Sequence, residues 1–474
     1  MIFGDLYLTF PETFPKLSAT SIYFVIFAFI VFALSRPFKN KFRPYILLIA
    51  NIIFLLSFST YHLIAVLLLS IVSYIFGLLI NKYKNKSILF CSVIPFIITL
   101  AIFKYYDLFT GQSLIMPLGL SFYTFIILSY LIDIYKDKVE VEKNIIYYLD
   151  YVMFFPVITA GPINRSKEFF IELKSRNEFD YVDAKNGAVQ MMLGIFEKKV
   201  FCDYVGIIVN QILNNNELYG INVFFGIILY SFYIYLDFDS ISNIAIGLSR
   251  LLGFHLHKNF NSPYLASNLK DFWRRWHISL STWLRDYVYI PLGGSRKGKY
   301  YRFLNLIIVF LVSGIWHGST INFVLWGLLH ALIQIIEDII IEPLKKVNFN
   351  KFSKVLLKIF GIALNFTIVT FLWLIFKYQT MDEVFNVLNR MFTAAPFSFE
   401  AIGLIRNEGI WLAIILLLTV IFDILRDKFD MIDFLSKRNF IIRWAFYTLL
   451  IVVFLVFGVY GGSFEASDFI YQFF

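Results

Sequence analysis

The sequence predicts an all-α, polytopic helical membrane protein with about eleven or twelve transmembrane or re-entrant helices. Of its 474 residues, 59% are hydrophobic and only 16% are charged, and the mean hydropathy is +0.71. Soluble domains carry about 25% charged residues, so a single water-soluble core cannot bury this much apolar surface. A helix satisfies its backbone hydrogen bonds within one segment and is therefore the usual way to cross a bilayer.

Charge and cysteine content exclude several other classes of protein. The 42 Lys and Arg exceed the 33 Asp and Glu by 9. In a membrane protein such an excess indicates basic cytoplasmic loops rather than a nucleic-acid partner. Cys91 and Cys202 are too few for a disulfide framework or a cysteine metal site. Residues 1–20 have no basic region followed by a small-residue cleavage site, so we expect no cleaved signal peptide.

Apolar runs near the length that a helix needs to cross the hydrocarbon, about 20 residues, succeed one another in the first third of the chain. They are residues 17–35, residues 45–80 as a hairpin turning near 59–62, residues 87–105 and residues 116–135. The basic residues that follow 35 and 80 predict cytoplasmic loops there and an N-terminus on the outer side.

The middle of the chain is less regular. Residues 147–160 form a short run that is expected to end at Gly161-Pro162. Residues 188–213 alternate apolar and charged positions, as an interfacial helix does. Two further apolar runs, 221–236 and 241–254, are separated by Asp237 and Asp239, for which we expect helix-end or interface positions.

A basic, tryptophan-containing segment precedes the longest apolar run. Residues 258–302 contain nine Lys and Arg against two Asp, a balance of 9 − 2 = +7, together with three Trp, which is typical of an interfacial or re-entrant segment. Residues 303–336 would extend roughly 50 Å as one helix at about 1.5 Å per residue, so we expect a break near 314–320. Runs at 355–376, 410–425 and 441–459 complete a single domain, residues 1–474.

His317 is the first candidate catalytic residue. It lies within the longest apolar run, where an ionisable side chain is by default a functional hypothesis. Gly314 and Gly318 would allow another backbone or a thin substrate to approach closely, and Trp316 offers a flat wall. An apolar site favours the neutral imidazole, which can accept a proton. The alternative is a histidine hydrogen-bonded across a helix interface.

His277 is the second candidate, in the sequence Asp271-Phe-Trp-Arg-Arg-Trp-His-Ile-Ser-Leu-Ser281. On a helix Trp273, Trp276 and His277 would share one face, while Arg274, Arg275 and Arg285 could reach phosphate or headgroups. An amphipathic interface helix with snorkelling arginines is the alternative. The other four histidines appear in no zinc-binding pattern, and we interpret them as structural or interfacial.

The order of several motifs is similar to that of the membrane-bound O-acyltransferase (MBOAT) family, in particular its bacterial alginate and peptidoglycan O-acetyltransferase branch. The resemblance covers nearly the whole chain. Its motifs are Pro117-Leu-Gly-Leu-Ser-Phe-Tyr-Thr-Phe125, Phe154-Phe-Pro156, Tyr235-Leu-Asp-Phe238, Asn259-Phe-Asn-Ser-Pro-Tyr264, Asp271–Ser281, Tyr289-Ile-Pro-Leu-Gly-Gly-Ser295 and Gly314-Ile-Trp-His-Gly318. The chain departs from the pattern of that branch at Ile126, Asp239-Ser240 and Lys377.

The resemblance implies a fold around a central channel and a reaction. His317 would be the general base and His277 the second signature residue. The residues expected to bind the donor or line the channel are Trp316, Trp276, Arg274, Arg275, Asp271, Ser281 and Arg285. No metal or bound cofactor is expected, and acetyl-CoA would be the co-substrate.

The expected partners follow from the same resemblance. They are the bilayer, an acetyl donor, a polysaccharide acceptor and a periplasmic SGNH-type acetyltransferase or esterase, in the bacterial inner (cytoplasmic) membrane, with no nucleic acid. Two alternatives stay open: D-alanyl transfer to teichoic acid, and a transporter of lipid-linked sugars in which Asp133, Asp237 and Asp239 are candidate proton-relay carboxylates.

Overall fold

The computed structural model describes residues 15–35, 42–175, 179–344 and 349–460. In these ranges the chain is helical, with no strand. Its internal contacts form two compact units. Of the described residues, unit 1 comprises 15–35, 42–175, 179–195 and 240–257; unit 2 comprises 196–239, 258–344 and 349–460. Residues 1–14, which make up most of the N-terminal segment in which we expect no signal peptide, lie outside the described residues. Residues 36–41, most of the first basic loop, lie outside them as well.

The number of apolar helices agrees with the sequence prediction. Within the described ranges, eight helices have the length and hydropathy to cross a membrane, and three shorter apolar helices accompany them. The eight are α3 (Thr60–Tyr83), α4 (Lys86–Thr110), α10 (Ile221–Leu251), α13 (Lys299–His317), α14 (Ile321–Leu344), α15 (Lys351–Lys377), α17 (Arg406–Arg426) and α19 (Phe440–Phe457). The three are α1 (Ile22–Ser35), α2 (Arg43–Leu56) and α5 (Leu120–Tyr135). The polytopic helical fold is therefore confirmed.

Unit 1 contains α1 to α5, α6 (Ile145–Met153), α7 (Ser166–Lys174) and almost all of α8 (Tyr181–Phe196). The predicted hairpin turns between α2 and α3, where the Ser59 hydroxyl accepts a hydrogen bond from the Tyr61 amide at 3.2 Å. Helix α6 ends at Met153, earlier than predicted. The Asn51 side chain accepts the Phe155 amide at 2.9 Å, and Pro156 has no amide hydrogen with which to continue the helix.

A polar clamp joins the end of α10 to the rest of unit 1. His255 places Nδ1 2.9 Å from Glu172 and Nε2 3.0 Å from Asp183. These two carboxylates raise the pKa of His255 to about 10. The ring is therefore protonated at neutral pH and bridges α7 and α8.

Helix α10 contradicts the prediction of two apolar segments. It is one helix of 31 residues, and Asp237 and Asp239 lie in its interior rather than at helix ends. Lys198 lies 2.7 Å from Asp237, and Arg426 forms an ion pair with Asp239. These cations neutralise the two carboxylates, so the helix continues through them.

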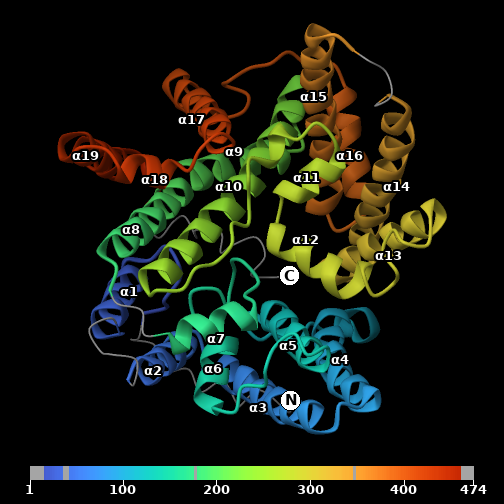
Figure 1. Cartoon of the computed structure of the whole chain (residues 1–474). Coiled ribbons are helices and arrows are strands. Elements are labelled where there is room, and N and C mark those ends of the chain that lie inside the picture. Colours follow the sequence, from blue (N-terminus) through green and yellow to red (C-terminus); the bar gives the residue numbers. More distant parts are fainter. Residues whose placement is uncertain (1–14, 36–41, 176–178, 345–348, 461–474) are drawn as a thin grey trace. The chain divides into compact units, whose positions relative to one another are not determined.

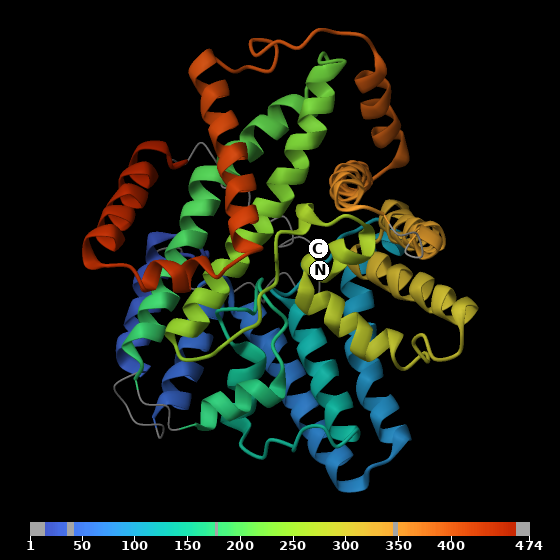
Figure 2. The same cartoon turned by 45° about the horizontal axis from the view of Figure 1, so that its top comes forward.

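The segment at residues 188–213 also differs from the expected interfacial helix. It forms the end of α8, the π-helix η2 (Glu197–Cys202) and α9 (Asp203–Leu213). Lys198 and Asp203 are buried and lie 2.9 Å apart. Two glycines allow α9 and α10 to approach closely. Gly206 on α9 lies against the Tyr233 side chain of α10, and Gly226 on α10 lies against Ile212 of α9, so the two helices pack on each other (Figure 2).

In unit 2 the longest apolar run is interrupted where predicted. Helix α13 ends at His317 and α14 begins at Ile321, and the two run side by side (Figure 1). A Cβ on Gly314 would lie 2.3 Å from the carbonyl oxygen of Phe323. Gly314 therefore allows α14, rather than a substrate, to approach α13. At the other end of the pair, Arg302 lies 3.3 Å from Asp338.

Short helices connect the spans of unit 2. The basic segment forms η3 (Pro263–Leu265), α11 (Leu269–Arg275), α12 (Ile278–Leu284) and η4 (Arg285–Tyr289). They are too short to cross a bilayer, which agrees with the predicted re-entrant or interfacial character. Helices α16 (Met381–Phe392) and α18 (Met431–Ser436) join α15, α17 and α19, which coincide with the three predicted C-terminal runs.

Candidate active site

The turn between α11 and α12 carries the first candidate histidine, and Asn259 holds that turn. The Asn259 carbonyl accepts the Ile278 amide at 2.9 Å, and its side-chain oxygen accepts the Ser279 hydroxyl at 2.9 Å. Beside it, the Asn261 amide donates to the Arg275 carbonyl at 2.9 Å. The Asn259–Tyr264 motif therefore fixes the backbone between α11 and α12 through hydrogen bonds.

His277 occupies this turn with a strained backbone. Its φ of 42° lies in the left-handed region, which residues other than glycine adopt rarely. The side chain is 3% exposed and contacts Phe238 and Phe260, with ring centroids 6.2 and 6.4 Å away. Burial lowers the pKa of His277 to about 3. At neutral pH this imidazole is uncharged.

Trp276, next to His277, joins a group of buried rings that we call the aromatic cluster: Trp276, Trp326, Trp373 and Phe376. The Trp276 and Trp373 ring centroids are 4.8 Å apart. Trp373 lies 6.0 Å from Trp326, which it stacks against, and 5.5 Å from Phe376. The cluster joins the turn that follows α11 to α14 and α15.

His317, the last residue of α13, lies at the other end of this cluster. Its ring is 5.1 Å from Trp326 and 5.1 Å from Phe376, nearly perpendicular to both. Trp316 lies 4.6 Å away, and the His317 side chain is 2% exposed. Both predicted histidines therefore border one continuous set of aromatic rings. In this conformation a substrate reaches the His317 ring only when a neighbouring side chain moves.

A third histidine, His330, borders the same cluster. It is fully buried on α14, and its ring lies 4.8 Å from Trp326 and stacks on Phe310. The Trp273 indole donates to His330 Nδ1 at 3.2 Å. The sequence interpretation treated His330 as structural or interfacial. The spacing of Trp326 and His330, four residues apart on a helix, is the signal that places both on one face.

The remaining predicted site residues separate into paired and exposed groups. Arg275 lies 3.1 Å from Asp271 and 2.6 Å from Asp427, and these carboxylates raise the pKa of Arg275 despite its partial burial. Ser281 donates to the Trp276 carbonyl at 3.3 Å. Arg285 is exposed and lies 2.9 Å from Asp286. Arg274 is exposed on α11. Of the three arginines, Arg275 is the one most extensively fixed within the fold.

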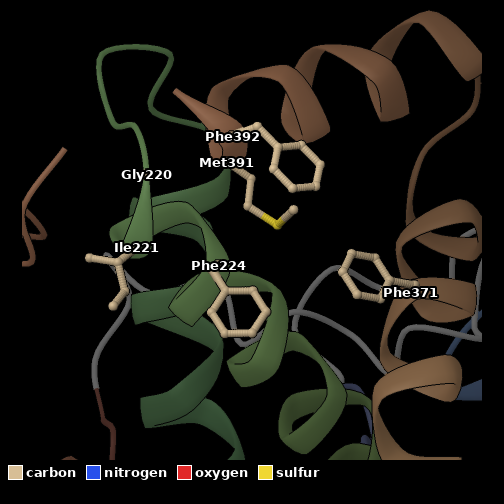
Figure 3. A pocket seen from close by; sticks show the side chains of 6 residues that line it. All are labelled: Gly220, Ile221, Phe224, Phe371, Met391 and Phe392. Atoms are coloured by element: carbon tan, nitrogen blue, oxygen red, sulfur yellow. The ribbon is translucent and has the colours of Figure 1, made fainter. Parts of the chain in front are cut away.

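A cavity of about 390 Å³ in unit 2 lies at other residues (Figure 3). Its lining is Gly220, Ile221, Phe224, Phe371, Met391 and Phe392. The side chains come from the start of α10, from α15 and from the end of α16, and none carries a polar group. This cavity therefore has no group that performs acid–base chemistry and is distinct from the candidate histidines.

The acid–base groups of the described part of the chain are not gathered into a metal-binding cluster. Among those residues, no group of three or more His, Cys, Asp or Glu is arranged to hold a metal ion. What the site offers is imidazole and indole nitrogens within a buried aromatic environment. Such groups can transfer protons and bind a carbonyl oxygen.

Comparison with known proteins relates this arrangement to a family. The sequence model of the MBOAT, membrane-bound O-acyltransferase, family matches residues 72–381, more than half of the chain. This segment contains His277, His317, His330 and the whole aromatic cluster.

Bacterial relatives carry names of two kinds of acyl transfer. A Pseudomonas syringae pv. tomato protein named "Probable alginate O-acetylase AlgI" is 31% identical over 318 residues, which cover 67% of this chain and 60% of that protein. The "Peptidoglycan O-acetyltransferase" of Helicobacter pylori is 33% identical over 306 residues, covering 59% of this chain and 57% of that protein. The "Teichoic acid D-alanyltransferase" of Streptococcus thermophilus is 30% identical over 292 residues, covering 56% and 69%. The chain thus spans about three fifths of the length of the first two relatives.

Proposed function

The chain belongs to the membrane-bound O-acyltransferase family, and on that basis we propose that it transfers an acetyl group from a cytosolic thioester across the bacterial inner membrane. The donor is acetyl-CoA, and the product is an O-acetylated cell-envelope polysaccharide. The names of two relatives, an alginate O-acetylase and a peptidoglycan O-acetyltransferase, support this class of acceptor. The multi-pass helical structure and the bacterial relatives support the location.

The observation that carries the proposal is the position of His317. Its imidazole is buried at the end of a membrane-spanning helix, among aromatic rings that exclude water. Excluding water favours transfer of the acetyl group to a hydroxyl over its hydrolysis. A neutral imidazole is a suitable general base for that hydroxyl.

In the proposed reaction the acceptor hydroxyl oxygen attacks the thioester carbonyl carbon. His317 takes the hydroxyl proton, the carbon–sulfur bond breaks, and the leaving thiolate receives that proton. His277 orients the acceptor or stabilises the developing negative charge. No redox partner is required, because the thioester already supplies the reactive bond.

The other site residues hold the donor. Arg274 and Arg285 extend from the basic segment as exposed cations that suit the phosphates of CoA. Arg275 and Asp271 shape α11 through their ion pair, and Ser281 fixes the following turn. Trp276 and Trp316 line the acyl path beside the two histidines. The acetyl group passes to the polysaccharide directly or through a periplasmic SGNH-type partner.

D-alanyl transfer to teichoic acid is the second candidate, favoured by the relative of that name. Its donor would be a carrier-protein thioester in place of acetyl-CoA. The transporter alternative has less support, because Asp237 and Asp239 are both in ion pairs with buried or half-buried cations. An opposite charge at ion-pair distance favours the ionised form of a carboxylate, which disfavours its uptake of a proton.

The test supplies purified, reconstituted protein with radiolabelled acetyl-CoA or with a D-alanylated carrier protein, and with alginate, peptidoglycan fragments or teichoic acid. Label transferred from acetyl-CoA to alginate or peptidoglycan is the expected result. Label transferred only from the carrier protein would replace the proposal with D-alanyl transfer. Proton flux that depends on Asp237, without transfer of either label, would favour transport.

A further inference from the structure

Trp326 contacts two imidazoles. Its ring centroid is 5.1 Å from that of His317 and 4.8 Å from that of His330, and it meets both imidazoles edge to face. Trp326 and His330 belong to the same face of α14, whereas His317 ends the neighbouring helix α13. All three side chains are at most 2% exposed. Any polar atom among them must therefore find its partner inside the protein or on a ligand.

The protonation of His330 follows from its contact with Trp273. An indole N–H is a donor only, and the Trp273 indole points its N–H at His330 Nδ1 over 3.2 Å. Nδ1 must therefore carry the lone pair. In the neutral ring the proton then resides on Nε2, so His330 presents Nε2–H as a hydrogen-bond donor.

Two buried donors are left without acceptors, one on Trp326, which contacts His317, and one on His330, which contacts Trp326. Among the described residues, none accepts a hydrogen bond from His330 Nε2 or from Trp326 Nε1, and both atoms are buried. A buried donor without a partner is strongly unfavourable. Both are neutral donors, so the group that completes them is a hydrogen-bond acceptor rather than a cation.

We propose that His330 Nε2–H and Trp326 Nε1–H bind the carbonyl oxygen of the acyl thioester on which His317 acts. This inference rests on the proposed function, because it assigns these donors to the same substrate. When the hydroxyl attacks, the carbonyl π electrons move to oxygen, and they return when the carbon–sulfur bond breaks. Donors placed at that oxygen stabilise the charge that accumulates between the two events.

The assignment also explains why Trp326 and His330, whose rings carry N–H groups, occupy positions that purely apolar side chains could fill. Phe in place of Trp326, or a smaller residue in place of His330, would remove the unfavourable orphaned donors, and an apolar cluster would need neither. A fixed pair of N–H groups in an aromatic environment is instead suited to a neutral, polarised carbonyl. The chemical class recognised is a thioester or amide carbonyl, not a phosphate or a sugar ring.

The test uses Trp326→Phe and His330→Asn. The first keeps an aromatic ring and removes the N–H. The second offers an amide oxygen to the Trp273 indole while removing the imidazole Nε2–H. We expect each to lower kcat for thioester turnover by about tenfold to a hundredfold. The matched control is Trp411→Phe on α17, whose indole nitrogen also has no acceptor among the described residues; its turnover is expected to stay within twofold.

Infrared spectroscopy separates binding from a merely structural effect. In a His317→Ala background, acetyl-CoA labelled with ¹³C at the acetyl carbonyl should show a carbonyl stretch at lower frequency than in buffer. Adding Trp326→Phe or His330→Asn should move that band back toward its position in buffer. The two variants change different turns of α14, so one of them decides the question if the other fails to fold.

Lower turnover together with the return of the carbonyl band toward its position in buffer supports the inference. An unchanged band in a folded variant overturns the inference whatever the turnover, and assigns the two donors to a structural role or to a buried water. If the unmodified protein turns over no thioester, the proposed function is wrong, and this inference, which rests on it, is wrong as well.

Discussion

Lys198 Nζ lies 2.7 Å from Asp237 Oδ1 in the interior of unit 2. Asp237 is in a membrane-spanning helix, and its charge is balanced by a residue of the π-helix η2 almost 40 positions earlier. Asp203, which Lys199 also contacts at 3.0 Å, completes a group of two cations and two carboxylates. Buried charges are tolerated when they are paired in this way.

Asp237→Asn is expected to destabilise the protein by about 3–5 kcal/mol, because it leaves Lys198 with one buried carboxylate fewer. The measurement is the thermal unfolding midpoint in detergent. The matched control is Asp433→Asn, which removes an exposed pair with Lys437 and should change stability by under about 1 kcal/mol. Equal midpoints for both variants would contradict the role of the buried group.

Arg274 and Arg275 are neighbours with different surroundings, and their variants should differ accordingly. Arg275→Glu places a third negative charge beside Asp271 and Asp427 and is expected to lower the yield of folded protein. Arg274→Glu should leave the yield unchanged while weakening acetyl-CoA binding about tenfold. Monodisperse yield and the Kd for the donor measure the two effects. Equal losses of both properties in both variants would assign the two arginines to the same structural role.

The stability of the protein should depend on the charge state of His277. The folded-state pKa is lowered to about 3 from an ordinary value of 6.5, so below pH 6.5 the unfolded chain binds a proton that the folded chain excludes. Stability is therefore expected to fall with pH below 6.5, by up to about 1.4 kcal/mol per pH unit. His277→Asn keeps a residue that tolerates positive φ and should flatten this dependence. Unfolding curves at pH 7.5 and 5.5 check the slope; an unchanged slope would contradict the buried neutral imidazole.

Gly314 determines how closely α13 and α14 approach. A Cβ at this position would meet the Phe323 carbonyl oxygen at 2.3 Å, whereas one on Gly318 would meet the Phe323 ring at 2.4 Å. Backbone cannot rotate away as a ring can. Gly314→Ala is therefore expected to lower both stability and turnover more than Gly318→Ala. Unfolding midpoints and initial rates of the two variants provide the comparison; a greater loss in Gly318→Ala would reverse the argument.

Local sequence signals predicted two of the turns between apolar helices, but not the end of α6 or the helices formed by residues 188–213. Ser59 after an apolar run, and the interruption at residues 318–320, both mark turns that the structure contains. The prediction of two apolar segments was wrong in α10, because Asp237 and Asp239 were interpreted as the boundary between two apolar runs. Their neutralising partners, Lys198 and Arg426, come from distant parts of the sequence, and no periodicity reveals such a pairing.

The sequence likewise predicted only part of the candidate site. Sequence pattern drew attention to His317 and His277, and the structure sets both beside the aromatic cluster. It did not identify His330, because the meaning of that residue depends on the direction of the Trp273 indole. The division between Arg274 and Arg275 likewise depends on Asp427, which lies 152 residues beyond Arg275.

Thioester turnover by His317→Ala tests the central claim most directly. The assay follows free thiol released from acetyl-CoA by purified protein in the presence of the acceptor polysaccharide, with His257→Ala, a change of an exposed residue in unit 1, as the control. If His317 is the general base, its variant loses turnover by at least about a hundredfold and retains its fold and its Kd for acetyl-CoA. Turnover at the parent rate in a folded His317→Ala protein would contradict the account.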